Sequence, residues 1–145
     1  MLSRGVFKVL LVEDSPADAR LTREALAVSL QEARLTVVSD GSEALRYLRR
    51  QEPYRHAPRP DLILLDLNMP RMDGYQVLAQ IKADADLRRI PVIMLSTSLS
   101  DNDVLRCYNL HANSYIAKPA DLEQFLEVVA KLMHFWFQVV SLPPK

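Results

Sequence analysis

The chain has 145 residues, of which 49% are hydrophobic and 25% charged, the ordinary mixture of a single globular domain. Eighteen basic residues balance eighteen acidic ones, and this zero net charge argues against nucleic acid as a partner, which needs a basic surface. Cys107 is the single cysteine, which excludes an internal disulfide or a thiolate metal cluster, and no apolar run reaches the roughly 18–20 residues of a membrane span. Because residues 1–8 lack a signal-peptide core, we expect a cytoplasmic protein with no membrane partner.

Apolar, strand-like segments alternate with helix-like segments five times along the chain. The predicted strands lie at residues 7–12, 35–38, 62–66, 91–95 and 113–117. The predicted helices run from Pro16 to about Leu30, through residues 42–48, from Gly74 through Ile81, from Asp101 to Tyr108, and onward from Asp121. This alternation predicts an α/β fold in which helices cover both faces of a parallel sheet. The four apolar residues before Asp66 suit a strand buried on both faces, with Asp66 where the strand reaches the surface.

Small polar residues precede four of the predicted helices and are expected to cap them. We predict these N-caps at Ser15, Ser42, Asp101 and Asp121. In the first helix, Leu21, Ala25 and Val28 recur at helical spacing and are predicted to face the core. Residues 51–60 carry three prolines and are predicted to form an extended surface connection into the third strand.

Polar side chains stand at the carboxyl ends of four predicted strands. Glu13 and Asp14 follow the first strand, Asp66 ends the third, and Ser96 and Lys118 follow the fourth and fifth. Because ligands of such sheets bind outside the carboxyl ends of the strands, we expect these side chains to converge.

The expected cluster combines three acids with one base and one hydroxyl. Three neighbouring carboxylates repel one another, and an all-oxygen site suits Mg²⁺, which removes that conflict. Lys118 adds a positive charge, and the Ser96 hydroxyl can donate to a bound oxyanion. A metal, an anion site and a nucleophilic carboxylate together favour phosphoryl transfer.

Each of these residues also has a simpler interpretation. Glu13 and Asp14 could form a charged helix entry, and Asp66 could be a turn residue that ends a strand. Ser96 could belong to a polar loop, and Lys118 could be a solvated strand end. Their joint placement at four strand ends of one fold favours the functional interpretation.

The motifs at these strand ends resemble those of a response-regulator receiver domain over nearly the whole chain. The matching segments are residues 10–14 (Leu-Leu-Val-Glu-Asp), 64–74 (Leu-Leu-Asp-Leu-Asn-Met-Pro-Arg-Met-Asp-Gly), 91–96 (Pro-Val-Ile-Met-Leu-Ser) and 118–119 (Lys-Pro). The resemblance implies a doubly wound, flavodoxin-like sheet of five strands in the order 2-1-3-4-5 with five helices. The length fits a single domain, which we place at residues 1–140, and the prolines in residues 141–145 predict a short tail that is not helical.

The resemblance also implies a role for each residue of the cluster. Asp66 would be the phosphoacceptor, and Ser96 and Lys118 would contact the phosphoryl group, while Tyr115 would act as an aromatic rotamer switch. The bond before Pro119 would be cis. The implied Mg²⁺ ligands are the carboxylates of Asp14 and Asp66, the backbone carbonyl of Asn68, and Glu13 through water.

A narrower resemblance covers the connection at residues 51–60 and the aromatic run near the end of the chain. Phe135, Trp136 and Phe137, followed by Leu142-Pro143, resemble the stand-alone receivers paired with bacterial and cyanobacterial phytochromes. This implies a sensor histidine kinase, a bacteriophytochrome, as phosphodonor, and a homodimer built on the last helix region. Three adjacent aromatic residues point in different directions around a helix, so at least one should be exposed as a dimer or partner surface.

Several alternatives remain open. The chain could be a phosphorelay intermediate or a phosphate sink, and because we expect no output domain after the last helix, output would pass through protein contacts. A Mg²⁺-dependent phosphatase with an aspartyl nucleophile would commonly carry a second acid two residues later, where this chain has Asn68. An adaptor that has lost phosphorylation would not need the complete set of residues. We therefore expect no enzymatic activity beyond the chain's own phosphorylation and dephosphorylation.

Overall fold

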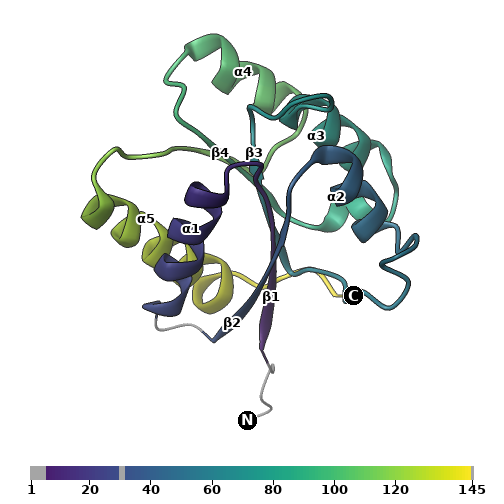
Figure 1. The fold of residues 1–145 in the computed structure, drawn as a ribbon, viewed down its shortest axis with the longest axis horizontal. Helices are drawn as coiled ribbons and strands as arrows, with labels where there is room; N and C mark the ends of the chain where they lie inside the picture. The colour runs from purple at the N-terminus through teal and green to yellow at the C-terminus, as the bar shows by residue number, and fades with distance from the viewer. Residues whose placement is uncertain (1–5, 30–31, 145) are drawn as a thin grey trace.

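The computed structural model describes residues 6–29 and 32–144 and contains one five-stranded parallel sheet (Figure 1). The strand order is β2-β1-β3-β4-β5, which confirms the expected topology. The strands are β1 (Phe7–Val12), β2 (Ala33–Val38), β3 (Leu62–Asp66), β4 (Val92–Ser96) and β5 (Ser114–Ala117). The α-helices are α1 (Pro16–Ala27), α2 (Gly41–Leu48), α3 (Gly74–Ala83), α4 (Asp101–Asn109) and α5 (Leu122–His134). A short 3₁₀ turn, η1 (Leu87–Arg89), precedes β4, and a π-helical stretch, η2 (Phe135–Val139), continues α5.

The sheet divides the interior into two cores, because successive residues of a strand face opposite sides. In β1, Val9 and Leu11 face the core under α1 and α5, whereas Leu10 and Val12 face the core under α2, α3 and α4. Figure 1 shows α1 and α5 on one face of the sheet and α2 and α3 on the other. Cys107 of α4 is buried in the second core, and this burial raises the pKa of its thiol to about 11, as suits a small apolar core residue.

The central strand β3 is buried along its whole length, as is its neighbour β4. Leu62, Ile63, Leu64 and Leu65 are all fully buried between β1 and β4. Burial of each such side chain contributes about 1.5–3 kcal/mol. Asp66 ends the strand as predicted, but it is 7% exposed and therefore lies deeper than a surface position.

Two of the four predicted helix caps are confirmed. The Ser15 hydroxyl accepts from the Asp18 amide at 3.2 Å, and the Asp121 carboxylate accepts from the Glu123 amide at 3.3 Å. The other two predictions are wrong, because α2 and α4 each begin before the expected position. Their caps are Asp40, which accepts from the Glu43 amide, and Ser100, which accepts from the Asp103 amide, so that Ser42 and Asp101 lie inside the helices.

The predicted inner face of α1 is also partly wrong. Ala25 is buried as expected, but the side chains that accompany it are Thr22 and Leu26, whereas Leu21 and Val28 are 38% and 67% exposed. The helix ends at Ala27, so Val28 lies beyond its last turn; the predicted end at Leu30 falls outside the described residues. Thr22 can occupy an inward position because its hydroxyl donates to the Asp18 carbonyl at 3.1 Å.

The proline-containing connection between α2 and β3 has no helix or strand, as predicted. Tyr54 anchors it, because its ring packs edge-on against Tyr47 at 5.2 Å and its hydroxyl donates to Glu43. Within the described residues, the cis peptide bond is Glu52–Pro53, so the predicted cis bond before Pro119 is wrong. The two isomers of such a bond differ by only about 0.5–1 kcal/mol, and the Lys-Pro motif alone does not determine which one forms.

The aromatic run after α5 divides between the core and the surface. Phe137 is buried and stacks on Phe7 of β1 at 4.0 Å, whereas Phe135 is 47% exposed. Trp136 is half-buried and contacts Phe135 edge-on at 5.5 Å. The prediction that at least one of the three is exposed is therefore confirmed. None of the helices described is long and apolar enough to cross a membrane.

Gly74 lets α3 begin directly against the end of β3. A Cβ atom at this position would lie 2.5 Å from the Asp66 carbonyl oxygen and 2.8 Å from the Leu67 Cα. The Gly74 amide also donates to the Leu67 carbonyl at 2.9 Å, so the two backbone segments are held together. The first turn of α3 is thereby packed on the backbone of Asp66.

The contact predicts a clear cost for the Gly74→Ala substitution. The added methyl group meets backbone atoms that cannot rotate away, so we expect the free energy of unfolding to fall by about 1–3 kcal/mol. Urea denaturation followed by circular dichroism measures this loss. Stability equal to that of the unsubstituted chain would show that the approach of α3 to Asp66 is looser than described.

Candidate functional site

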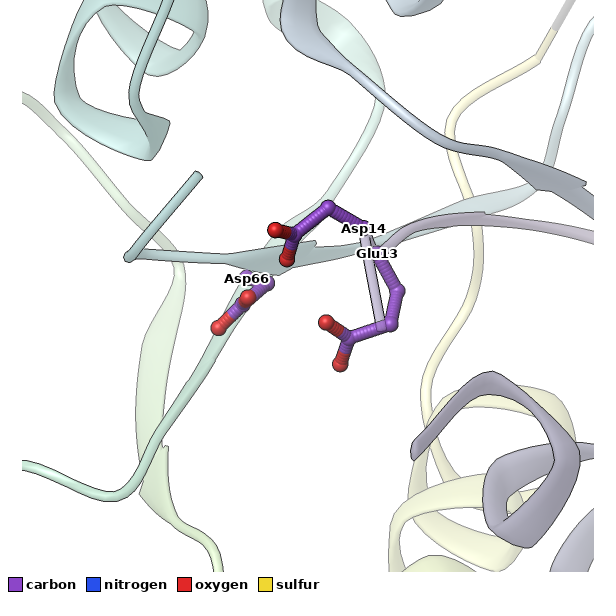
Figure 2. Close-up of side chains that lie close together, drawn as sticks. All are labelled: Glu13, Asp14 and Asp66. Atoms are coloured by element: carbon purple, nitrogen blue, oxygen red, sulfur yellow. The ribbon is translucent and has the colours of Figure 1, made fainter. Parts of the chain in front are cut away.

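Three carboxylates meet at the carboxyl ends of β1 and β3. One carboxylate oxygen from each of Glu13, Asp14 and Asp66 lies within 4.8 Å of the other two. Glu13 and Asp66 are 3% and 7% exposed, whereas Asp14 is exposed to solvent. Figure 2 shows the side chains of Glu13, Asp14 and Asp66 close together. The predicted convergence of these three residues is confirmed.

The alternation of side chains along the strands explains which groups share a side. Leu11 and Leu64 face the core under α1 and α5, so Glu13 and Asp66, each two residues further on, continue toward the same side. Lys118 follows Ile116 of that core by the same step. The topology therefore brings two acids and the base to one side of the sheet edge.

Lys118 is the basic centre of this cluster. Its Nζ lies 2.8 Å from Glu13 Oε1, 3.6 Å from Asp66 Oδ1 and 3.5 Å from Asp18 Oδ2. Burial lowers the pKa of the lysine, but the hydrogen bond that Lys118 donates to Glu13 and the charges of Asp66, Glu13 and Asp18 outweigh this effect, so the pKa is raised. Lys118 is therefore held as an ammonium group although its side chain is only 12% exposed.

The surroundings of Asp66 disfavour its ionised form. Burial is the main cause, and together with the charges of Glu13 and Asp14 it outweighs the opposing charge of Lys118, raising the pKa of Asp66 to about 7. Lys118 alone therefore does not balance the negative charge gathered at the sheet edge.

The donor set fits a hard divalent cation. Three carboxylates with oxygen atoms in mutual reach supply the ligand type that Mg²⁺ and related ions prefer, and a bound cation would relieve their repulsion. Asp14 is exposed, which leaves one side of this cluster open to water. Asn68 lies exposed in the loop after β3, two residues beyond Asp66.

Ser96 and Tyr115 lie on the other side of the sheet edge. Ser96 is fully buried at the end of β4, and its hydroxyl oxygen accepts from the Ser98 amide at 3.1 Å. Its carbonyl accepts from the Lys118 amide at 2.7 Å, which ties the ends of β4 and β5 together. Tyr115 is half-buried against the core under α2, α3 and α4, and its hydroxyl donates to the Ser98 carbonyl at 2.9 Å.

The aromatic residues predicted as a dimer or partner surface are not part of this cluster. Phe135, Trp136 and Phe137 follow the far end of α5, and Phe137 stacks on Phe7 at the start of β1. The cluster lies at the opposite ends of the strands. The chain thus separates the acidic site from the exposed aromatic surface by the length of the sheet.

Sequence reasoning missed Asp18 as a neighbour of Lys118. Asp18 lies in the first turn of α1, and Ser15 caps this helix at the carboxyl end of β1. This position could have indicated that Asp18 lies near the site. A cavity of about 250 Å³ opens beside Asp18 and Lys118, with Leu21, Thr97 and Leu122 among its lining residues. Leu21 therefore borders the site instead of the core.

Comparison with known proteins agrees with this fold and arrangement. The family model of the response regulator receiver domain matches residues 9–130. The response regulator Rcp1 of Synechocystis sp. is 46% identical over 135 residues, which cover 93% of this chain and 92% of that protein. The phosphorylated cyanobacterial phytochrome response regulator RcpA is 48% identical and superposes with a TM-score of 0.92, covering 97% of this chain and 100% of that one. The Mn²⁺-bound form of Rcp1 is 45% identical with a TM-score of 0.89, covering 95% and 99%.

The family match runs from residue 9 to residue 130 and therefore includes every strand end that carries a residue of the site. The matches with Rcp1 and RcpA confirm the resemblance to phytochrome response regulators that the motifs and the aromatic run predicted. The family match alone spans more than half of the chain. The chain belongs to the family of response-regulator receiver domains.

Proposed function

We propose that this chain is a single-domain response regulator in which Asp66 accepts a phosphoryl group from a histidine kinase. The observation that carries this proposal is the position of Asp66, a nearly buried carboxylate at the end of the central strand with Lys118 Nζ at 3.6 Å. Membership of the receiver family supports the same role. The chain then catalyses only its own phosphorylation and dephosphorylation.

The proposed reaction transfers a phosphoryl group from a phosphohistidine nitrogen to Asp66. A carboxylate oxygen attacks phosphorus, the P–N bond breaks, and the histidine nitrogen keeps the bonding pair and takes a proton from solvent. Catalysis of such a transfer consists mainly of positioning and charge neutralisation. Lys118 lies close enough to both Glu13 and Asp66 to exchange its contact with Glu13 for one with the phosphoryl oxygens.

We assign Mg²⁺ to the carboxylate cluster. Asp14 and Asp66 would hold it directly, Glu13 through water, and Asn68 through its backbone carbonyl. The bound cation would neutralise part of the negative charge gathered between the carboxylates and the phosphoryl oxygens. The mutual reach of the three carboxylates and the Mn²⁺-bound form of the similar Rcp1 support a divalent cation here.

Phosphorylation would act on a switch formed by Ser96 and Tyr115. It replaces one negative charge at Asp66 by a larger dianionic group, toward which the Ser96 hydroxyl turns. Tyr115 shares the α4 side of the sheet with Ser96 and responds to the space that Ser96 leaves. The result is a shift between two packings of the surface formed by α4, β5 and α5.

We further propose that the phosphodonor is a phytochrome kinase. The similar RcpA is a phytochrome response regulator, and the match covers the full length of that chain. Phosphotransfer from an ATP-dependent kinase of this kind would place the protein in the cytoplasm. A phosphorelay intermediate or a phosphate sink would use the same acceptor, whereas an aspartyl-nucleophile phosphatase is disfavoured by Asn68 at the position of its second acid.

The exposed aromatic surface suits a homodimer. Phe135 and Val139 of η2 are 47% and 60% exposed, and Trp136 of the same segment is half-buried. Apolar side chains grouped in this way gain free energy when a partner covers them. We propose a second copy of the chain as that partner.

The Asp66→Asn substitution tests the phosphoacceptor. It keeps the size of the side chain but removes the nucleophilic carboxylate, so phosphorylation by acetyl phosphate in the presence of Mg²⁺ should disappear. Intact-mass spectrometry should show one added phosphoryl group on the unsubstituted chain and none on the variant. Undiminished Mg²⁺-dependent incorporation in the variant would rule out this acceptor.

The Asp14→Asn substitution tests the metal site. Loss of one carboxylate from an all-oxygen site should weaken Mn²⁺ binding, measured by electron paramagnetic resonance, by about tenfold or more. Asp101→Asn is the matched control, because Asp101 is an exposed acid on α4 outside the cluster. Equal Mn²⁺ affinity in both variants would contradict the assignment.

The Phe135→Glu substitution tests the dimer surface. A charge in the centre of a covered apolar surface is costly, so the variant should be monomeric at concentrations where the unsubstituted chain scatters light as a dimer. Leu105→Glu on α4 is the control, because Leu105 is 59% exposed on another helix and should leave the dimer intact. A monomer at high micromolar concentration in the unsubstituted chain, with and without beryllofluoride, would refute the homodimer.

A further inference from the structure

The carboxylate of Asp103 joins α3 to the loop between β4 and α4. The Tyr75 hydroxyl donates to Asp103 Oδ1 at 2.5 Å, and the Ser98 hydroxyl donates to Oδ2 at 2.6 Å. Both bonds are short, as expected where the acceptor is ionised. The Ser98 and Tyr75 hydrogen bonds also lower the pKa of Asp103, so the bridge is a charged one.

On one side, the bridge leads to the backbone of the proposed acceptor. Tyr75 is only 9% exposed and follows Gly74, whose Cα packs against the Asp66 carbonyl. The Arg106 guanidinium lies 3.8 Å above the Tyr75 ring, which further restricts this side chain. Because Tyr75 is held in place, its hydroxyl anchors the Asp103 carboxylate next to the site.

On the other side, the bridge leads to both proposed switch residues. The Ser98 amide donates to the Ser96 hydroxyl oxygen at 3.1 Å, and the Ser98 carbonyl accepts from the Tyr115 hydroxyl at 2.9 Å. Ser98 thus touches Ser96 and Tyr115 through its backbone while its side chain is held by Asp103. A displacement of Ser98 would therefore disturb its contacts with both residues.

A simpler explanation for Asp103 is its place in the first turn of α4, where an acid interacts favourably with the helix dipole. Asp101 lies in the same turn and meets that requirement equally. None of the contacts described involves the Asp101 side chain, whereas both oxygens of Asp103 accept from other elements. The helix dipole does not account for those two contacts.

We propose that Asp103 is a positioning residue that fixes the β4–α4 loop to α3 and so presets Ser96 and Tyr115 for the phosphoryl group. The proposal rests on the function proposed for Asp66. Without the bridge, the loop would have to become ordered when the phosphoryl group binds, and that ordering would reduce the affinity. Asp103 is placed to act through Ser98 and does not touch the reacting atoms.

The main test compares the beryllofluoride affinities of Asp103→Ala and Asp101→Ala in the presence of Mg²⁺, using beryllofluoride as the phosphoryl mimic. Both variants remove one charge from the same helical turn, but Asp103→Ala alone removes the bridge. We expect binding about two- to tenfold weaker for Asp103→Ala, the range that follows from ordering one or two side chains. Asp101→Ala should bind as the unsubstituted chain does. Equal affinities in the two variants would overturn the proposal and leave the proposed function intact.

A double-mutant cycle shows whether the effect passes through the bridge. Tyr75→Phe and Ser98→Ala each remove one hydroxyl, and each should weaken beryllofluoride binding while Asp103 is present. Their effects should be non-additive in that background and vanish in Asp103→Ala. A purely structural role would leave the two effects additive in both backgrounds, and that result would count against positioning. These two variants also keep the test decisive if Asp103→Ala does not fold.

A metal-free readout separates this proposal from the proposed function. The amide resonance of Ser98 and the ring resonances of Tyr115 should shift in Asp103→Ala and stay in place in Asp101→Ala, without any ligand. Unmoved resonances would contradict positioning whatever the chain binds. If the unsubstituted chain binds no beryllofluoride, the proposed function fails, and the role of Asp103 in phosphoryl binding fails with it.

Discussion

The structure depends on the charge balance at the end of β3, where Asp66 lies nearly buried beside one ammonium group and two further acids. The apolar run that makes β3 the centre of the sheet also withdraws Asp66 from water, and this raises the pKa of its carboxyl. Lys118 offsets part of the negative charge through Glu13 and Asp66. The negative charge that Lys118 does not offset makes the cluster suited to bind a cation, together with a group whose oxygens Lys118 can contact.

The parallel sheet explains which residues of the site lie on each of its two sides. Alternation along each strand sends Glu13, Asp66 and Lys118 toward α1 and α5, while Ser96 and Tyr115 lie on the side of α4. The charged groups and the proposed switch residues are thus neighbours at one edge of the sheet but lie on opposite faces of it. Under the proposed function, a change at Asp66 would reach the α4 side of the sheet through Ser96 and Tyr115.

The sequence predicted those parts of the structure that follow from local pattern. The strand order came from the family resemblance, and the cluster at the strand ends came from residue type together with the geometry of parallel sheets. The predictions of helix caps failed where two nearby residues could both cap the same helix. These pairs are Asp40 and Ser42 for α2, and Ser100 and Asp101 for α4. The predictions also missed contacts between distant segments, because the bond between Tyr75 and Asp103 joins residues 28 positions apart, and no pattern in either helix indicates it.

The most direct test of the central claim is to locate the phosphoryl group on the chain. After incubation with acetyl phosphate and Mg²⁺, borohydride reduction converts an aspartyl phosphate into homoserine, and peptide mass spectrometry then identifies the modified position. The account predicts homoserine at Asp66 and at none of the other acids of the cluster. Reduction at Glu13 or Asp14, or a stable phosphoryl group on a hydroxyl or histidine side chain with Asp66 unchanged, would contradict it.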